Sequence, residues 1–237
     1  MPDHAPAPVA VLTGASSGIG LATARLLASS GWRIALVARD PARLEQARAT
    51  LHNPDTHRII PSDLALQGAP DHVISTTLSH FKRLDALINN AGLAPLLPID
   101  KHDEALLQRL YTVNAIAPAR AIAACWPHFV TRRGGVIVNV STLGTRDPFP
   151  GFFGYASSKA AVNLLAQSAA KEGKPHNIRA FSVAPGAVET PMLRALFDTS
   201  AIPSSSCLSP DDVARVIVDC VEGRRDQDNG KVIYLSS

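Results

Sequence analysis

Tyr155 and Lys159 are the two side chains whose types and spacing best suit proton-transfer chemistry in this sequence. They lie where a loop rich in glycine and proline, 144–154, gives way to an apolar run, 156–172, that is typical of a buried helix. A separation of four residues places both side chains on one helix face. A phenol titrates near pH ~10, so acid/base work near neutrality requires its pKa to fall by roughly 3. A lysine cation about 4 Å away supplies about 4 kcal/mol, which is the required magnitude.

A tyrosine and a lysine at this spacing also occur by chance at the start of a surface helix, so the rest of the chain decides between the two interpretations. An apolar strand predicted at 9–12 runs into the loop Thr13-Gly-Ala-Ser-Ser-Gly-Ile-Gly20 and then into a helix rich in alanine and leucine, 21–29. Glycines at such a turn let the backbone approach a pyrophosphate, which then faces unpaired N–H groups at the helix start. The order of strand, loop and helix predicts a dinucleotide site.

The end of the second predicted strand, 33–38, indicates the type of dinucleotide. An NAD site usually places Asp or Glu there, whereas a basic residue accommodates the 2′-phosphate of NADP. Ala38 is followed by Arg39, so the charge favours NADP(H) over NAD(H). Asp40 has two interpretations. It could contact the ribose, but with Pro41 it is better suited to cap a helix over 42–51.

Further apolar runs complete an alternating pattern of strands and helices. Strands are predicted at 57–60, 86–89, 135–140, 178–183 and 231–235, and helices at 71–81, 101–129, 156–172 and 209–222. The helix over 101–129 is expected to bend near Pro118 and Pro127. The alternation predicts one α/β domain over 1–237, a doubly wound, seven-stranded parallel sheet with ligands beyond the C-terminal ends of its strands.

Several polar or small residues lie near the predicted strand ends. Asp63 is interpreted equally well as an acceptor for adenine or as a helix cap, and the small residues of Asn89-Asn-Ala-Gly92 allow a cofactor close to the backbone. Asn114 lies among apolar neighbours. This setting is more typical of a buried amide whose hydrogen bonds are made within the core than of a catalytic residue. The serine-rich stretch 199–206 is typical of a mobile lid.

Composition narrows the function classes. The 237 residues are 46% hydrophobic, and the net charge of +3 comes from interspersed basic and acidic residues, which gives no footprint for nucleic acid or an anionic membrane. The cysteines Cys125, Cys207 and Cys220 have neither disulfide nor zinc spacing, so no metal site is expected. Neither an export signal nor an apolar run of 18 residues is recognised, so we expect a cytoplasmic protein.

The sequence resembles the short-chain dehydrogenase/reductase family over essentially its whole length. The resemblance is carried, in the family's order, by the Thr13–Gly20 loop, Asn89-Asn-Ala-Gly92, Asn114, Tyr155-xxx-Lys159, and Pro185-Gly186 with Thr190. It implies a Rossmann-type sheet with helices on both faces and a nicotinamide cofactor. It also implies interconversion of a carbonyl and an alcohol with Tyr155 as acid/base, while Lys159 binds the nicotinamide ribose and lowers the pKa of Tyr155. Asn114 would anchor a water molecule in the proton relay.

The resemblance also implies a set of cofactor contacts. These are Gly14, Ser16, Gly18, Ile19 and Gly20 at the phosphates, Asp63 and Leu64 at the adenine, Asn90 and Ala91 at the ribose, and Val188 and Thr190 at the nicotinamide end, with Ser17, Arg39, Gly92, Pro185 and Gly186 as further contacts.

Thr142 is the departure from the family pattern. The family's catalytic serine usually falls 13 residues before the tyrosine and 28 after the asparagine, and both counts reach Thr142. Threonine keeps the hydroxyl that would donate to the substrate oxygen, although its methyl group takes space. Ser141 ranks second because it would point the other way along the strand. The substitution leaves an alternative open, a nucleotide-binding sensor or scaffold that turns over poorly.

The expected substrate pocket is bounded by 93–97, 143–153 and 192–208, the last of which lies in a short lid over about 191–209. Its side chains favour a small hydrophobic carbonyl compound, and they include Leu96, Phe149, Phe152, Phe153, Met192 and Leu196. Arg146 and Arg194 are the cations expected nearby. They could bind a carboxylate or phosphate of the substrate, although a surface position is the commoner interpretation of such arginines. The family's habit of pairing long helices implies a homodimer or homotetramer.

Overall fold

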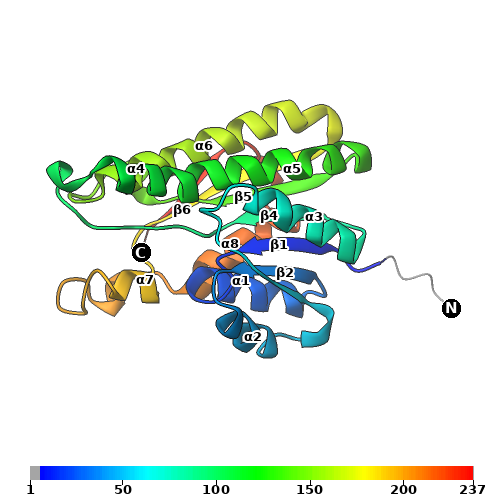
Figure 1. The fold of residues 1–237 in the computed structure, drawn as a ribbon, viewed down its shortest axis with the longest axis horizontal. Coiled ribbons are helices and arrows are strands. Elements are labelled where there is room, and N and C mark those ends of the chain that lie inside the picture. The colour runs from blue at the N-terminus through cyan, green and yellow to red at the C-terminus, as the bar shows by residue number, and fades with distance from the viewer. Residues whose placement is uncertain (1–5, 237) are drawn as a thin grey trace.

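The computed structural model describes residues 6–236, and within them one sheet of seven parallel strands forms the centre of the molecule (Figure 1). The strand order is β3-β2-β1-β4-β5-β6-β7. The strands are β1 (Val9–Thr13), β2 (Arg33–Ala38), β3 (Arg58–Pro61), β4 (Ala86–Asn89), β5 (Gly135–Val140), β6 (Ile178–Pro185) and β7 (Val232–Leu235). The predicted doubly wound parallel sheet is confirmed.

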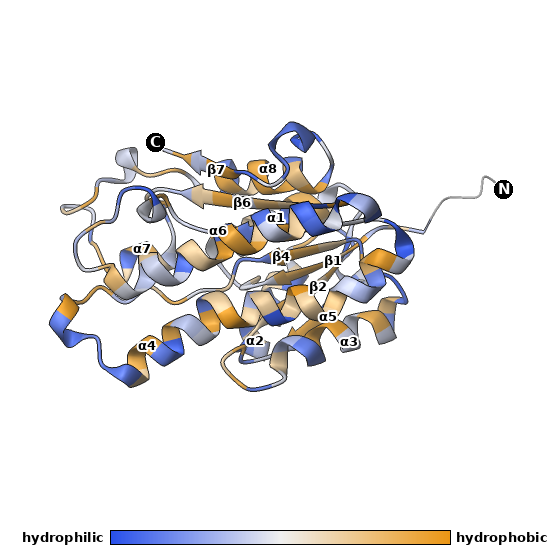
Figure 2. Ribbon diagram, turned by 90° about the horizontal axis from the view of Figure 1, so that it is seen from above, coloured by the Kyte–Doolittle hydropathy of each residue, from blue (hydrophilic) through white to orange (hydrophobic). Residues whose placement is uncertain are grey.

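Helices cover both faces of the sheet, and the central strands β1, β4, β5 and β6 are largely apolar and buried on both sides (Figure 2). The edge strands β3 and β7 are partly exposed. The α-helices are α1 (Gly18–Ser29), α2 (Pro41–Ala49), α3 (Ala69–Phe81), α4 (Glu104–Tyr111), α5 (Ala117–Arg132), α6 (Phe153–Gly173), α7 (Pro191–Arg194) and α8 (Pro210–Val221). Leu27 of α1, Leu44 of α2 and Ile217 of α8 pack in one core cluster. Phe129 of α5 and Val73 of α3 belong to the cluster on the opposite face, which α6 also joins.

The order in which strands are added to the sheet reverses between β1 and β4. These two strands pair in parallel, with Val11 opposite Leu87. The chain adds β2 and β3 on one side of β1, and then returns to add β4 and later strands on the other. Crossover connections on opposite faces separate at this point and leave a crevice beyond the C-terminal ends of the two strands. The fold therefore places the ligand site between the residues that follow Thr13 and those that follow Asn89.

The helix predicted as continuous over 101–129 is interrupted, which corrects the sequence interpretation. A 3-10 turn, η2 (Ile99–Lys101), precedes α4, and a π-helical turn, η3 (Thr112–Ile116), separates α4 from α5. The irregular turn does not fall at either proline. Pro118 lies in the first turn of α5, where a missing N–H costs nothing, and Pro127 lies inside α5.

The other short turns connect the regular elements. They are the 3-10 helices η1 (Pro54–Thr56), η4 (Leu143–Thr145), η5 (Lys174–His176), η6 (Ser204–Ser206) and η7 (Asp226–Asp228). The lid, 191–209, contains α7 and η6, and its two ends are held together where Val188 and Leu208 form an isolated parallel bridge. Ser209 then starts α8 with a capping box in which its side chain and that of Asp212 bond each other's backbone N–H.

Candidate active site

The glycine loop between β1 and α1 needs residues without side chains. Gly14 and Gly18 adopt φ values of +68° and +53°, which favour glycine. A Cβ on Gly14 would lie 2.7 Å from Asn90 Nδ2, and one on Gly20 would overlap the carbonyl oxygen of Gly14. Ser17, the N-cap of α1, makes no side-chain capping bond. The first N–H groups of α1 therefore have no acceptor from the cap, and a ligand anion suits them.

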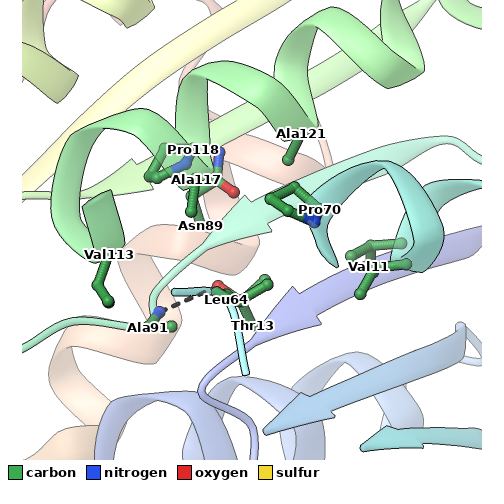
Figure 3. A pocket seen from close by; sticks show the side chains of 11 residues that line it. Val11, Thr13, Leu64, Pro70, Asn89, Ala91, Val113, Ala117, Pro118 and Ala121 are labelled. Atoms are coloured by element: carbon green, nitrogen blue, oxygen red, sulfur yellow. Dashed lines mark hydrogen bonds between the residues drawn. The ribbon is translucent and has the colours of Figure 1, made fainter. Parts of the chain in front are cut away.

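The ends of β1 and β4 are bonded to each other through Thr13. Its Oγ1 accepts from the backbone N–H groups of Asn90 and Ala91, both at 3.0 Å, and Asn90 Nδ2 donates to the carbonyl oxygen of Thr13 at 2.9 Å. Figure 3 shows the Ala91 bond at the edge of a void of about 10 Å³. That volume is close to one water molecule, so this void is too small for a cofactor.

A much larger cavity, of about 600 Å³, lies beyond the C-terminal ends of the strands. It is lined by residues from elements that are far apart in the sequence. The sequence-predicted residues on its wall are Gly14, Ser16, Ser17, Gly18, Ile19, Arg39, Asp63, Leu64, Asn90, Ala91, Gly92, Thr142, Tyr155, Lys159, Pro185, Gly186, Val188 and Thr190. The glycine loop and the tyrosine–lysine pair thus share one space.

Gly20 and Asn114 lie outside that wall. Gly20 packs beneath Gly14. Asn114 is fully buried in η3, where its side chain bonds the backbone N–H and carbonyl of Leu93 at 2.8 and 2.9 Å and donates to Ser158 Oγ at 2.9 Å. Asn114 is thus the satisfied core hydrogen bonder that its apolar neighbours indicated, and it ties the cavity wall at Leu93 to α6. The water-anchoring role implied for it stays a prediction.

Burial governs the ionisation of the two central side chains. It raises the pKa of the Tyr155 phenol to about 12, with a smaller opposing effect from a hydrogen bond to the Thr142 side chain. It lowers the pKa of Lys159, which is 4% exposed, to about 8. The Lys159 ammonium donates to the carbonyl oxygen of Val140 at 2.8 Å. In this structure desolvation dominates, so the pKa of Tyr155 is raised. The expectation that Lys159 lowers it beside a bound cofactor stays a prediction.

Thr142 and Ser141 point to opposite sides of the chain that leaves β5. Ser141 is 2% exposed and donates to the carbonyl oxygen of Lys159 at 3.3 Å, so its hydroxyl serves the packing of α6. Thr142 Oγ1 accepts from the backbone N–H of Gly144 at 3.2 Å. That bond leaves the Thr142 O–H free to donate toward Tyr155, which supports Thr142 over Ser141 as the serine substitute.

The two acidic residues near the adenine end make local backbone bonds. Asp40 Oδ1 accepts from the backbone N–H groups of Ala42 and Arg43 at 2.9 and 3.1 Å, so the helix-cap interpretation is the one observed. Asp63 Oδ1 accepts from the backbone N–H of Ala65 at 3.0 Å and still lines the cavity, whereas α3 is capped at Gly68. The helix cap considered for Asp63 is therefore not formed.

At the substrate end, four side chains that the sequence placed at the pocket do not line the cavity. Leu96 packs against Gly151, and Phe153 is 49% exposed beside His102, so neither lines the cavity. Arg146 and Arg194 are also absent from the wall. Phe149, Phe152, Met192 and Leu196 line it as expected.

Sequence reasoning missed three charged residues of the wall, Arg43, Arg109 and Asp147. Arg43 had a recognisable signal. It lies in the first turn of the helix that Asp40 caps, and that helix begins two residues after Arg39, whose charge favours NADP. Arg109 precedes Val113 by four residues and so lies on the same face of a helix. Asp147 had no local signal, since it lies in a loop whose path depends on the tertiary fold.

Comparison with known proteins agrees with this geometry. The family model described as short chain dehydrogenase matches residues 8–201. The chain is a member of the short-chain dehydrogenase/reductase family.

Named relatives and solved structures of this short-chain dehydrogenase/reductase family are similar over most of their length. The chain is 31% identical to a fatty acyl-CoA reductase of Acinetobacter baylyi over 91% of this chain and 73% of that protein. It is 32% identical to a 2-(R)-hydroxypropyl-CoM dehydrogenase of Xanthobacter autotrophicus over 80% and 78%. The structure of a 3-ketoacyl-(acyl-carrier-protein) reductase from Brucella melitensis complexed with NADH superposes with a TM-score of 0.90 at 26% identity, covering 97% and 96%.

The residues of this short-chain dehydrogenase/reductase fit a nicotinamide dinucleotide. Side chains at Gly14 and Gly20 would fill the turn that the pyrophosphate approaches, and the start of α1 lacks a side-chain cap. The cavity continues from that turn to Tyr155 and Lys159 and has a suitable volume. Within residues 6–236, no cluster of His, Cys, Asp and Glu could hold a metal ion, and no helix is long and apolar enough to cross a membrane.

Proposed function

We propose that this chain is an NADP(H)-dependent oxidoreductase that interconverts a ketone or aldehyde and the corresponding alcohol. The observation that carries the proposal is one cavity whose wall holds the glycine loop at one end and Thr142, Tyr155 and Lys159 at the other. A redox role on carbonyl and alcohol groups also matches the names of the family members to which the chain is similar.

The reacting end assigns a separate task to each side chain. When bound, the nicotinamide cofactor supplies hydride for reduction or accepts it in oxidation. The Thr142 hydroxyl donates a hydrogen bond to the carbonyl oxygen, and the Tyr155 phenol transfers its proton to that oxygen as negative charge develops there. Lys159, held by the carbonyl of Val140, presents its ammonium toward the cofactor ribose.

The raised pKa of Tyr155 suits reduction. A phenol with a pKa of about 12 is protonated at neutral pH and can act as the general acid. An alkoxide is more basic than a phenolate, so the transfer remains favourable. Burial thus prepares Tyr155 to give a proton rather than to take one.

The preference for NADP(H) is supported by charge at the end of β2. Arg39 and Arg43 both line the cavity and are exposed there, in position to meet a 2′-phosphate. Asp40, the acidic residue nearby, uses its carboxylate to cap α2. Its Oδ1 accepts both capping bonds, which leaves only Oδ2 for the ribose hydroxyls of NAD, while two arginines line the same part of the cavity. The local charge therefore favours the phosphorylated cofactor.

Thr142 does not favour the alternative, a nucleotide-binding sensor without turnover. Its hydroxyl lies beside Tyr155, where the reaction needs it, and its methyl group is accommodated in the wall. A reducing cytoplasmic setting belongs to the same proposal, because Cys125 and Cys220 are buried free thiols. One domain over 1–237 is proposed because all seven strands join one sheet.

Replacement of Tyr155 by phenylalanine tests the proposed function. We expect Tyr155→Phe to lower kcat/KM for ketone reduction by about 10³-fold, because the general acid is lost while the ring and its packing remain. The dissociation constant for NADPH, measured by fluorescence titration, should change less than about twofold. Tyr234→Phe is the control, because it removes a phenol outside the cavity. Turnover of Tyr155→Phe at the wild-type rate would refute the assignment.

A further inference from the structure

The substrate end of the cavity is built around a cluster of aromatic rings. Phe149 packs edge-on against Phe197 with ring centroids 5.9 Å apart, and Phe152 lies 6.0 Å from Phe149 and 6.3 Å from Phe197. Phe152 also contacts the ring of Tyr155 at 5.3 Å. The loop 144–152 and the lid thus form one apolar wall that ends at the proton donor. An aryl or alkyl group attached to the reacting carbonyl would lie against this wall.

The lid's own cation is withdrawn from the cavity. Arg194 bonds both carboxylate oxygens of Glu189, at 2.6 and 2.5 Å, and donates to the backbone carbonyls of Asp198 and Ile202 at 3.1 and 2.8 Å. Because Arg194 bonds to Glu189, the pKa of that carboxyl falls to about 2, and the pair stays ionised at neutral pH. The guanidinium is therefore neutralised by Glu189 and saturated by acceptors inside the lid.

The second expected cation, Arg146, is turned away as well. Its guanidinium lies 5.6 Å from the ring centroid of Tyr234, and Arg146 does not line the cavity. The arginines that do line it lie on the dinucleotide side. Arg39 and Arg43 follow β2, and Arg109 shares a helix face with Val113, which lies beside Ala91 in Figure 3.

Apart from Lys159, whose ammonium is buried and bonded to the carbonyl of Val140, one charged residue lies at the substrate end, and it is negative. Among the described cavity-lining residues of 93–97, 143–153 and 192–208, Asp147 alone carries a charge, and it makes no ion pair within residues 6–236. A substrate carboxylate, phosphate or sulfonate placed there would meet a like charge and apolar rings. A neutral group would meet neither penalty, and a cation would meet a partner.

Resting on the proposed function, we propose that the substrate is an apolar, preferably aromatic, carbonyl compound without an anionic group, and that Asp147 is the residue that discriminates against anions. A cationic substituent is accepted because it faces the same carboxylate. The inference narrows the substrate class at the site already described and leaves the mechanism unchanged.

The experiment uses three acetophenones that differ only in the para substituent: methyl, carboxylate or trimethylammonium. Binding of each to the protein–NADP⁺ complex, which cannot reduce a ketone, is measured by calorimetry. The value of kcat/KM is measured by NADPH consumption at about 0.05 M salt, where surface charge is weakly screened. We expect the methyl and trimethylammonium compounds to bind at least about tenfold more tightly than the carboxylate. Asp147→Asn should reduce the ratio between the cationic and anionic compounds by about fivefold, and the ratio should fall further in high salt for the wild type.

Asp55→Asn is the matched control. Asp55 is almost fully exposed, and it lies before β3, at the edge of the sheet opposite the cavity. The control removes the same charge and should leave the ratio within about twofold. Three results would overturn the inference. They are equal effects of the two substitutions, binding of the carboxylate compound as tight as or tighter than the others, and no binding of any of the three compounds. Binding in the expected order without NADPH consumption would contradict the proposed function and leave the charge selection standing.

Discussion

Burial, rather than a neighbouring charge, sets the ionisation of the residues at the reacting end. Lys159 follows Tyr155 by about one helical turn, and this spacing predicts that both side chains lie on the same face of the helix. The structure places both on the cavity wall but engages the lysine with the carbonyl of Val140, 19 residues away on β5. A contact between a strand end and a helix depends on how the two elements pack, so no local pattern reveals it. The same packing desolvates the phenol.

The pH dependence of alcohol oxidation should report this desolvation. Oxidation requires the Tyr155 phenolate, whose fraction grows about tenfold per pH unit below a pKa of about 12. We expect kcat/KM for oxidation to rise with a slope near +1 between about pH 6 and 7.5, below the pKa of about 8 at which Lys159 loses its charge, while reduction, which uses the protonated phenol, stays nearly level. Initial rates with an alcohol and NADP in constant-ionic-strength buffers measure both pH profiles. A plateau in oxidation already reached by pH ~7 would show that the phenol ionises far more easily in the complex.

Cofactor choice is also decided by single side chains. Arg39→Asp should weaken NADPH binding by about tenfold or more, because it places a carboxylate where the 2′-phosphate would lie, and should leave NADH binding unchanged or improved. Fluorescence titration with both cofactors measures the two dissociation constants. Arg133→Asp, at the C-terminal end of α5, makes the same charge change away from the cavity. An equal loss for NADPH and NADH would contradict the charge argument.

The lid contains only two short helical turns, and one side chain, Arg194, makes many of its hydrogen bonds. Arg194 alone connects Glu189, the carbonyls that follow α7, and Ser204 of η6. The sequence indicated a serine-rich lid here, but it placed Arg194 as a candidate for binding a substrate anion. Which role Arg194 takes depends on where Glu189 lies, five residues earlier. The helical turn α7, which Thr190 caps, brings the two side chains together.

Removal of that arginine should loosen the lid without touching the reacting groups. We expect Arg194→Ala to raise KM for a ketone by about tenfold with kcat within about twofold, and to speed proteolysis within 195–207. Steady-state kinetics and limited proteolysis followed by mass spectrometry measure the two effects. The control, Arg215→Ala, removes an exposed arginine that pairs with Asp212 on α8. A fall in kcat at constant KM would instead indicate a role for Arg194 in the chemistry.

The interrupted helix is the other element that the sequence described incompletely. Apolar residues continue through 101–129, and the two prolines are the visible irregularities. The π-helical turn falls at Asn114 because that amide bonds the backbone of Leu93 on one side and Ser158 of α6 on the other. Competition from tertiary hydrogen bonds, which has no local signature, decides the local helix geometry there.

For the whole molecule, the sheet could be predicted from sequence because every strand is a short apolar run bounded by loop residues. Once the strand order of a doubly wound sheet is taken, the right-handedness of parallel crossovers fixes the face on which each helix lies. What the sequence pattern leaves open is the outer surface of the helices. Ile116 and Leu164 are 53% and 63% exposed on η3 and α6, near the partly exposed Tyr111. We propose that this surface joins two copies of the chain.

The oligomeric state can be tested with two matched substitutions. Leu164→Glu should convert a dimer or tetramer to a smaller species, because it places a charge within an apolar contact. Leu66→Glu changes a leucine of nearly equal exposure, 64%, that precedes α3 and should leave the assembly intact. Sedimentation velocity at micromolar concentrations distinguishes the species. A wild-type monomer, or equal dissociation by both substitutions, would contradict the proposed surface.

The closed ends of the lid have a practical consequence. Leu208 donates its backbone N–H to the carbonyl of Ala187, and Glu189 donates to the carbonyl of Leu208, so the segment leaves and rejoins the sheet at nearly one point. A stretch anchored in this way can be transplanted as a unit. Grafting 189–207 from this chain onto another scaffold with the same parallel bridge would carry over its internal arginine bonds together with Thr190. A new substrate range could then be engineered by exchanging one segment while the glycine loop that faces the phosphates stays unchanged.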